Sequence, residues 1–279
     1  MSYFYGVPIG SPEDSASIAK TDLDRALQVM RPKPSPFPLV RIGGGADGAY
    51  LLPDDLKGIK ACLSPGVNNA KPFEDELCNH YGIECHMIDA SSDIANFATP
   101  LIQGKQTFKK LWLDIDGAGN SMSLAAWVDS LGLVSGDDLI LQMDIEGADR
   151  LDKQFACVHA HPNNLLGDYL IPGTKTRVPR LLEVTYLRKD RFQSSPGSKK
   201  FDALLPHPLD IVNGEAYPPL HLDPSWSGQQ RRLISKRKMA SDWLNFFRVY
   251  GANNLTPTAR SRSKSRLKAL LMPPLLKRL

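Results

Sequence analysis

Two carboxylates stand near the end of an apolar segment of strand length, residues 138–147. Asp144 and Glu146 are two residues apart, and since side chains alternate along a strand, both share a face with Gln142. Ligands of open α/β sheets collect beyond the carboxyl ends of the strands, so this position suits a site. We predict that Asp144 is a catalytic base or a ligand of a divalent metal, with Glu146 as the second catalytic residue. The alternative is a structural role, in which Asp144 caps the following turn.

A second candidate site combines a turn of small residues with an acid further along the chain. A glycine in such a turn lets a ligand approach the backbone closely. A carboxylate about 20 residues later can accept the hydroxyl hydrogens of a ribose. The pattern Gly-x-Gly-x-x-Gly is absent from this turn, which disfavours a pyrophosphate and favours a nucleoside cofactor such as S-adenosylmethionine. The predicted cofactor-binding residues are Ser64, Pro65, Gly66, Asp89 and Asp144.

Three histidines are candidates for contact with a substrate. His159 and His161 are two residues apart, on one face of an expected strand, and His207 lies with Asp210 in a proline-rich segment. The first two could bind a metal with a nearby acid. We favour the alternative, a hydrogen-bonded pair that closes the next loop. The loop position of His207 suits recognition of a substrate.

Strands that alternate with helices must position these residues. The expected strands are residues 59–67, 84–89, 111–115 and 138–147, and the expected helices are residues 72–81 and 124–131. The first helix has acids in its first turn, where the helix dipole favours them, and Gly82 ends it. Ser123 caps the second helix. This alternation predicts an α/β, Rossmann-like fold with a mostly parallel sheet and helices on both faces.

The segments before this sheet are expected to be short. Residues 11–30 contain a predicted helix, which the prolines of residues 31–38 end because proline removes a donor and fixes φ. Residues 39–42 and 50–52 flank a glycine-rich turn, which predicts a hairpin. A phosphate-binding loop is the alternative, although neither a P-loop lysine nor a following helix is present.

The net charge of +4 is divided unevenly along the chain. Residues 228–279 carry 13 Lys or Arg and one acid, Asp242, whereas residues 1–227 have a net charge of −8. We predict three parts, residues 1–38, 39–227 and 228–279, of which the last is a basic tail. This tail could contact an anionic membrane. A solvated tail is the favoured alternative, and nucleic acid is disfavoured because no aromatic–basic platform is present.

The cysteines and the first residues of the chain indicate in which cellular compartment the protein is expected. The four cysteines show no Cys-x-x-Cys spacing, which predicts reduced thiols and disfavours a zinc site. The first residues lack the basic start and apolar region of a signal peptide. No apolar run approaches the roughly 20 residues needed to cross a bilayer. We expect a cytoplasmic protein, with peripheral contact to the inner membrane face through the basic tail.

An ordered set of motifs runs through residues 39–226. The set consists of Arg41-Ile-Gly-Gly, Leu63-Ser-Pro-Gly-Val67, Ile88-Asp89, Gln142-Met-Asp-Ile-Glu-Gly-Ala148, Val158-His-Ala-His-Pro-Asn-Asn164, Leu182-Glu-Val-Thr-Tyr-Leu-Arg188 and Pro206-His-Pro-Leu-Asp210. It resembles the FkbM-like S-adenosylmethionine-dependent methyltransferases, particularly a bacterial branch linked to surface-glycan genes. The resemblance implies a class I methyltransferase fold, S-adenosylmethionine as the cofactor, and an oxygen acceptor such as a sugar hydroxyl of a glycan or its precursor.

One departure from the family pattern affects the sheet. After Ala148 the relatives are expected to carry a helix, a core strand and a further helix, whereas here residues 149–154 lead directly to the extended residues 155–161. A parallel crossover needs at least roughly 10–12 residues, so residues 155–161 must pair antiparallel or lie elsewhere. This apparent internal deletion predicts the loss of one core strand and an exposed sheet edge. A degenerate, non-catalytic protein is therefore the alternative to an enzyme.

Overall fold

The computed structural model describes residues 27–45, 47–114, 117, 119–143, 154–170, 177–192, 200–222 and 226, and the backbone of a short hairpin formed by β1 (Tyr3–Phe4) and β2 (Val7–Pro8). The chain divides into two compact units, residues 1–214 with 220–233, and residues 215–219 with 234–279. All the described helices and strands belong to the first unit.

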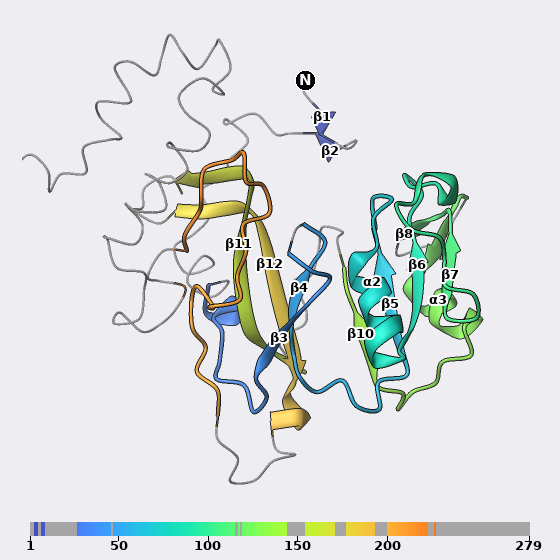
Figure 1. Cartoon of the computed structure of the whole chain (residues 1–279), viewed down its shortest axis with the longest axis horizontal. Coiled ribbons are helices and arrows are strands. Elements are labelled where there is room, and N and C mark those ends of the chain that lie inside the picture. The colour runs from blue at the N-terminus through green and yellow to red at the C-terminus, as the bar shows by residue number, and fades with distance from the viewer. Residues whose placement is uncertain are drawn as a thin grey trace, which may run out of the picture. The chain divides into compact units, whose positions relative to one another are not determined.

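The first unit contains a four-stranded parallel sheet with the order β10-β5-β6-β7 (Figure 1). Its strands are β5 (Ala61–Pro65), β6 (Glu84–Ile88), β7 (Gln106–Lys109) and β10 (Leu139–Leu141). Every residue of β5 is buried, as expected for a strand with parallel neighbours on both sides. The predicted strands at residues 59–67 and 84–89, and the start of the strand at 138–147, are confirmed.

Two helices connect these strands where the sequence predicts them. Helix α2 (Pro72–Glu76) continues as the π-helix η2 (Leu77–Tyr81) and ends at Gly82, which has a left-handed φ of 70°. Helix α3 (Leu124–Ser130) begins after Ser123, whose side chain accepts a hydrogen bond from a backbone N–H of the first turn. A hydroxyl cap satisfies a donor that has no partner within the helix.

These helices pack on opposite faces of the sheet because neighbouring residues of β5 point to opposite sides. Cys62 belongs to a buried cluster that includes Phe73 and Leu77 from α2 and η2. Leu63 belongs to a second cluster that includes Trp127 of α3. The predicted α/β architecture, with a parallel sheet and helices on both faces, is therefore confirmed.

The third strand of the sheet differs from the prediction. Of the predicted strand at residues 111–115, the described residues 111–114 do not join the sheet, because β7 occupies that position and β8 (Trp112–Asp114) pairs with β9 (Ser121–Ser123) instead. Strand β7 begins with Gln106, which is buried and donates to Asp75 Oδ1 at 3.0 Å. A polar residue can be buried when a residue distant in the chain satisfies its hydrogen bonds. Such a residue does not contribute to the apolar pattern by which a strand is predicted. The short 3-10 helix η3 (Ile94–Asn96) precedes β7.

Two antiparallel hairpins complete the described chain. Strand β3 (Leu39–Ile42) pairs with β4 (Tyr50–Pro53), so the predicted hairpin is confirmed. Strand β11 (Phe155–Leu170) pairs with β12 (Arg177–Arg188). Residues 155–161 therefore pair antiparallel and outside the parallel sheet, as the short link before them predicts. Among the described residues, no helix is long and apolar enough to cross a membrane.

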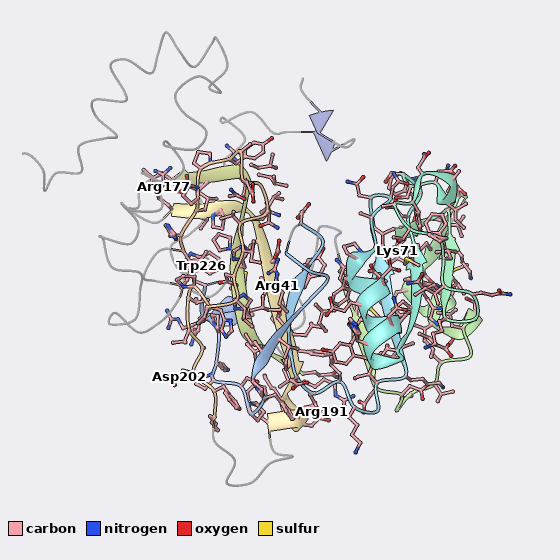
Figure 2. All side chains as sticks on the ribbon, in the orientation of Figure 1. Arg41, Lys71, Arg177, Arg191, Asp202 and Trp226 are labelled. Carbon is pink, nitrogen blue, oxygen red and sulfur yellow. The ribbon has the colours of Figure 1, made fainter. Side chains whose placement is uncertain are left out.

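Charged side chains join the end of β12 to the start of β10. Arg191, in the 3-10 helix η5 (Lys189–Phe192), lies 2.6 Å from Asp138 and 2.6 Å from Asp55 (Figure 2). Arg188 lies 3.1 Å from the same Asp138 carboxylate. Asp138 directly precedes β10, so this network attaches the β11–β12 hairpin to the edge strand of the sheet.

We predict that Trp127→Ala lowers the free energy of unfolding by about 3–5 kcal/mol, because it removes a fully buried aromatic side chain between α3 and the sheet. Urea denaturation at constant pH measures this loss. The matched control is Trp112→Ala, since Trp112 is 58% exposed and its loss should change stability by less than about 1 kcal/mol. Equal losses for the two variants would contradict the packing described above.

Candidate functional site

The carboxyl ends of β5 and β10 are neighbours where the strand order reverses. Strands β6 and β7 follow on one side of β5, and β10 lies on the other side. Open α/β sheets bind ligands at such a switch point. The pairing continues to the end of β5, because Gln142 N donates to Leu63 O at 3.0 Å. The turn that follows β5 therefore starts at the position where a ligand is expected.

This turn changes from buried to accessible at Gly66. Ser64 and Pro65 are buried, and Ser64 Oγ lies 3.4 Å from Cys62 Sγ in the core. Gly66 is partly exposed, and its φ of 82° is strained for any residue with a Cβ. Its N–H donates to Ile88 O at 3.0 Å, which connects the turn to β6. Of the predicted turn residues, Gly66 is the one that a ligand can reach.

Asp89 follows β6 and accepts six hydrogen bonds, two of which come from this turn. Val67 N and Asn68 N each donate to Oδ2 at 3.0 Å. Ser91 and Ser92 donate through both their backbone N–H groups and their hydroxyls, at 2.6–3.2 Å. Burial raises the pKa of Asp89, but these donors outweigh burial and hold the pKa at about 2. The structure thus places Asp89 against the predicted turn.

The hydrogen bonds of Asp89 limit how it could bind a ribose. A carboxylate offers about four lone-pair positions, and all are engaged by the protein. A ribose hydroxyl could be accepted only if Ser91 or Ser92 released its own hydroxyl. The sequence contains a signal for this arrangement, because an Asp followed by two nearby serines is typical of local side-chain caps.

The predicted catalytic residues Asp144 and Glu146 lie outside the described residues, which on this strand end at Met143. Leu141 and Met143, the last described apolar residues, are 42% and 37% exposed. The catalytic assignment of Asp144 and Glu146, and the metal site that they could form, stay predictions.

The three predicted histidines come together around Asp210, His159 and His161 from β11 and His207 from the segment that carries Asp210. His159 Nε2 lies 2.9 Å from Asp210 Oδ1, and His161 Nδ1 lies 3.6 Å from Asp210 Oδ2. The rings of His159 and His207 meet edge to face, with 5.9 Å between their centroids. The predicted shared face of His159 and His161 is confirmed, because both reach one carboxylate. What the sequence did not reveal is that Asp210 is their common partner.

The cluster is buried, and the pKa values of Asp210, His161 and His207 are shifted. The side chains of His159, His161 and Asp210 are 4%, 11% and 6% exposed. Burial raises the pKa of Asp210, but the two imidazoles outweigh burial and leave the pKa low. Burial lowers the pKa of His161, but the Asp210 and Glu183 carboxylates outweigh burial and leave the pKa raised. Burial and the nearby His159 together lower the pKa of His207.

His159 and His161 approach different oxygens of the Asp210 carboxylate, and each contact becomes an ion pair when its imidazole is protonated. Within the described part of the chain, no three His, Cys, Asp or Glu side chains are placed to hold a metal ion. All four cysteines are buried free thiols. The favoured alternative for His159 and His161 is a pair that closes the next loop with Asn163 and Asn164. In the structure these asparagines continue β11, and both histidines contact Asp210 on a distant segment instead. Contact of the histidines with a substrate stays a prediction.

Comparisons with protein-family models, with curated proteins and with solved structures find no match. The resemblance of the motifs to FkbM-like methyltransferases stays a prediction.

We predict that Asp89→Asn destabilises the protein by about 2–3 kcal/mol at neutral pH, because an amide cannot replace a charged acceptor of six donors. The folded pKa is depressed, so the contribution of Asp89 is present above its ordinary pKa of 3.8 and is lost as the pH falls toward about 2. The difference in urea stability between wild type and Asp89→Asn should therefore shrink between pH 7 and pH 3.

The matched control is Glu84→Gln on the same strand, whose side chain is 58% exposed. It should leave stability nearly unchanged at both pH values. A pH-independent difference between wild type and Asp89→Asn would contradict the role of the ionised carboxylate.

Proposed function

We propose that this chain is an S-adenosylmethionine-dependent O-methyltransferase of the FkbM-like kind, acting on a sugar hydroxyl of a glycan or glycan precursor. The observation that carries the proposal is the strand order β10-β5-β6-β7, with the Gly66 turn and Asp89 at its switch point. Nucleotide-binding half-sheets use this order and bind the ligand at this position. The motif resemblance supplies the reaction and the acceptor class.

The turn after β5 could bind an adenosyl group through its backbone at Gly66 and through the Asp89 carboxylate. The exposed backbone at Gly66 allows close approach, while Val67 N and Asn68 N are already bound to Asp89 and do not offer a phosphate site. A ribose hydroxyl that replaced a serine hydroxyl on Asp89 would exchange one O–H donor for another, so the number of hydrogen bonds would be conserved. This arrangement favours a nucleoside over a dinucleotide.

Asp144 is the residue to which we assign the proton transfer. S-adenosylmethionine, when bound, supplies an activated methyl group. Asp144 comes three residues after Leu141, the last residue of β10, which borders the switch point. A carboxylate beside the acceptor hydroxyl would orient it and take its proton. Glu146 is the second choice for the same role.

A second candidate function, a degenerate methyltransferase-like protein without activity, is favoured by two observations. Asp89 is saturated by internal donors. Among the described strands, β5 alone pairs with β10, since β11 pairs with β12 instead. A protein of this kind would keep the sheet and lose the cofactor. The basic tail, residues 228–279, could still give it peripheral contact with an anionic membrane.

The first test is calorimetric titration with S-adenosylhomocysteine. We predict binding in the micromolar range, and no binding of NAD at the same concentrations, because the turn amides that would hold a pyrophosphate are occupied by Asp89. A cooperative thermal melt of the same sample shows that it is folded. A folded sample that gives no heat with millimolar S-adenosylhomocysteine would contradict the proposal and support the degenerate alternative.

The second test is Asp144→Asn. We predict that transfer of labelled methyl groups to sugar acceptors falls by about 10²–10⁴-fold, because a general base is lost. Because Asp144 is also a predicted cofactor-binding residue, the transfer is measured at saturating S-adenosylmethionine. The control is Asp137→Asn, at the opposite end of β10, where the side chain pairs with Lys60 at 2.8 Å. An Asp144→Asn variant with wild-type transfer would remove Asp144 from the mechanism.

A further inference from the structure

Residues 206–214, here called the strap, are attached to the β11–β12 hairpin by polar side chains. Asp210 contacts His159 and His161, as described above. At the far end of the strap, the Asn164 side chain donates to Gly214 O at 2.8 Å and accepts from Gly214 N at 2.9 Å. The strap is thus held at its middle by charges and at its end by a neutral amide.

A third contact lies between these two. Asn213 Nδ2 donates to Glu183 Oε1 on β12 at 2.5 Å, and to Asp47 Oδ1 in the β3–β4 turn at 3.0 Å. Glu183 is the cross-strand neighbour of His161. The neutral amide of Asn213 therefore lies between two carboxylates, which repel each other unless a positive charge is close.

The strap buries its charge and exposes its apolar side chains. The Asp210 side chain is 6% exposed, whereas Leu209, Ile211 and Val212 are 42%, 38% and 39% exposed. Burial of apolar surface is the usual force that holds a segment in place. Here it contributes little at these three positions, so the attachment depends on the charged and hydrogen-bonded groups.

The charged groups around His161 come from every element that faces it. Asp210 on the strap, Glu183 on β12 and Arg41 on β3 act on it directly. Asp47 in the β3–β4 turn acts on Glu183, and His159 of β11 contacts the same Asp210 carboxylate. Figure 2 marks Arg41 on β3. Three carboxylates and one fixed cation belong to this group. His161 Nδ1 lies 3.6 Å from Asp210 Oδ2, so a proton on this imidazole reduces the imbalance and strengthens its contact with Asp210.

We propose that the strap is a proton-controlled closure of the hairpin, held in place while His161 is protonated and released when this imidazole becomes neutral. His207, at the start of the strap, lines a cavity of about 280 Å³ together with Phe37, Val158 and Phe201. Release of the strap would displace His207, the strap residue that lines this cavity. Proton loss therefore changes the lining of a small cavity, independently of the proposed methyl transfer.

The direction of the pH effect follows from the two partners. The Asp210 and Glu183 carboxylates outweigh burial and raise the pKa of His161 above its ordinary value of 6.5, so the closure is present below that value and is lost as the pH rises through the raised pKa. The pKa of Asp210 lies well below its ordinary value of 3.8, so this carboxylate stays charged in mild acid. Release is therefore expected on the alkaline side.

Hydrogen exchange of the full chain, read by mass spectrometry on peptides that span the strap, tests this proposal. After correction for intrinsic exchange rates, protection of the strap should fall by up to about tenfold per pH unit between 6.5, the ordinary pKa of a released imidazole, and the raised pKa of His161. It should level off at higher pH, because one proton is linked to closure only between these two values. His161→Asn should give low protection at all pH values. The matched control, His80→Gln on an exposed side chain of η2, should follow wild type.

Two outcomes would overturn the proposal. One is a corrected protection of the strap that is the same in mild acid and in mild alkali. The other is an unchanged pH profile in His161→Asn. Should that variant fail to fold, imidazole NMR of the wild type decides. A His161 that titrates above 6.5 supports the closure, and one that titrates at or below this value refutes it.

Discussion

The Asp89 carboxylate accepts six hydrogen bonds, two from the turn after β5 and four from the serines that follow β6. Without this charge, the backbone N–H groups of Val67 and Asn68 would be left without their acceptor beside a buried strand. Unpaired donors in such a place cost free energy that a small turn cannot recover elsewhere. The position of Gly66 at the switch point, and hence the candidate cofactor site, depends on this one interaction.

The same interaction separates the two candidate functions. A ligand with hydroxyl groups can compete with Ser91 and Ser92 for Asp89, because one hydroxyl replaces another without loss of hydrogen bonds. A ligand that needs the turn amides must instead displace the carboxylate itself. The arrangement therefore favours a nucleoside over a dinucleotide, in agreement with the proposed cofactor. A protein that no longer binds a cofactor would be stabilised by the internal serines in the arrangement that the structure shows.

Charge also determines how the hairpin β11–β12 is attached. Asp138 forms ion pairs with Arg188 and Arg191 at the edge of the sheet. Asp210, on the strap, contacts two histidines of β11. The arginine pairs keep their charge at all physiological pH values, whereas the histidine pairs do not. The attachment to the sheet is thus permanent, and the attachment of the strap responds to protons.

The sequence by itself determined the local elements and one long-range consequence. Gly82 and Ser123 mark helix ends because their chemistry acts within a few residues, and the short link of residues 149–154 excludes a parallel crossover on length alone. Tertiary structure decided the rest. Gln106 became a strand residue because Asp75, 31 positions away, satisfies its amide, and Asp210 met His159 and His161 across a large gap in the chain. Such partners depend on where the folded chain brings distant groups together, and periodicity carries no information about that.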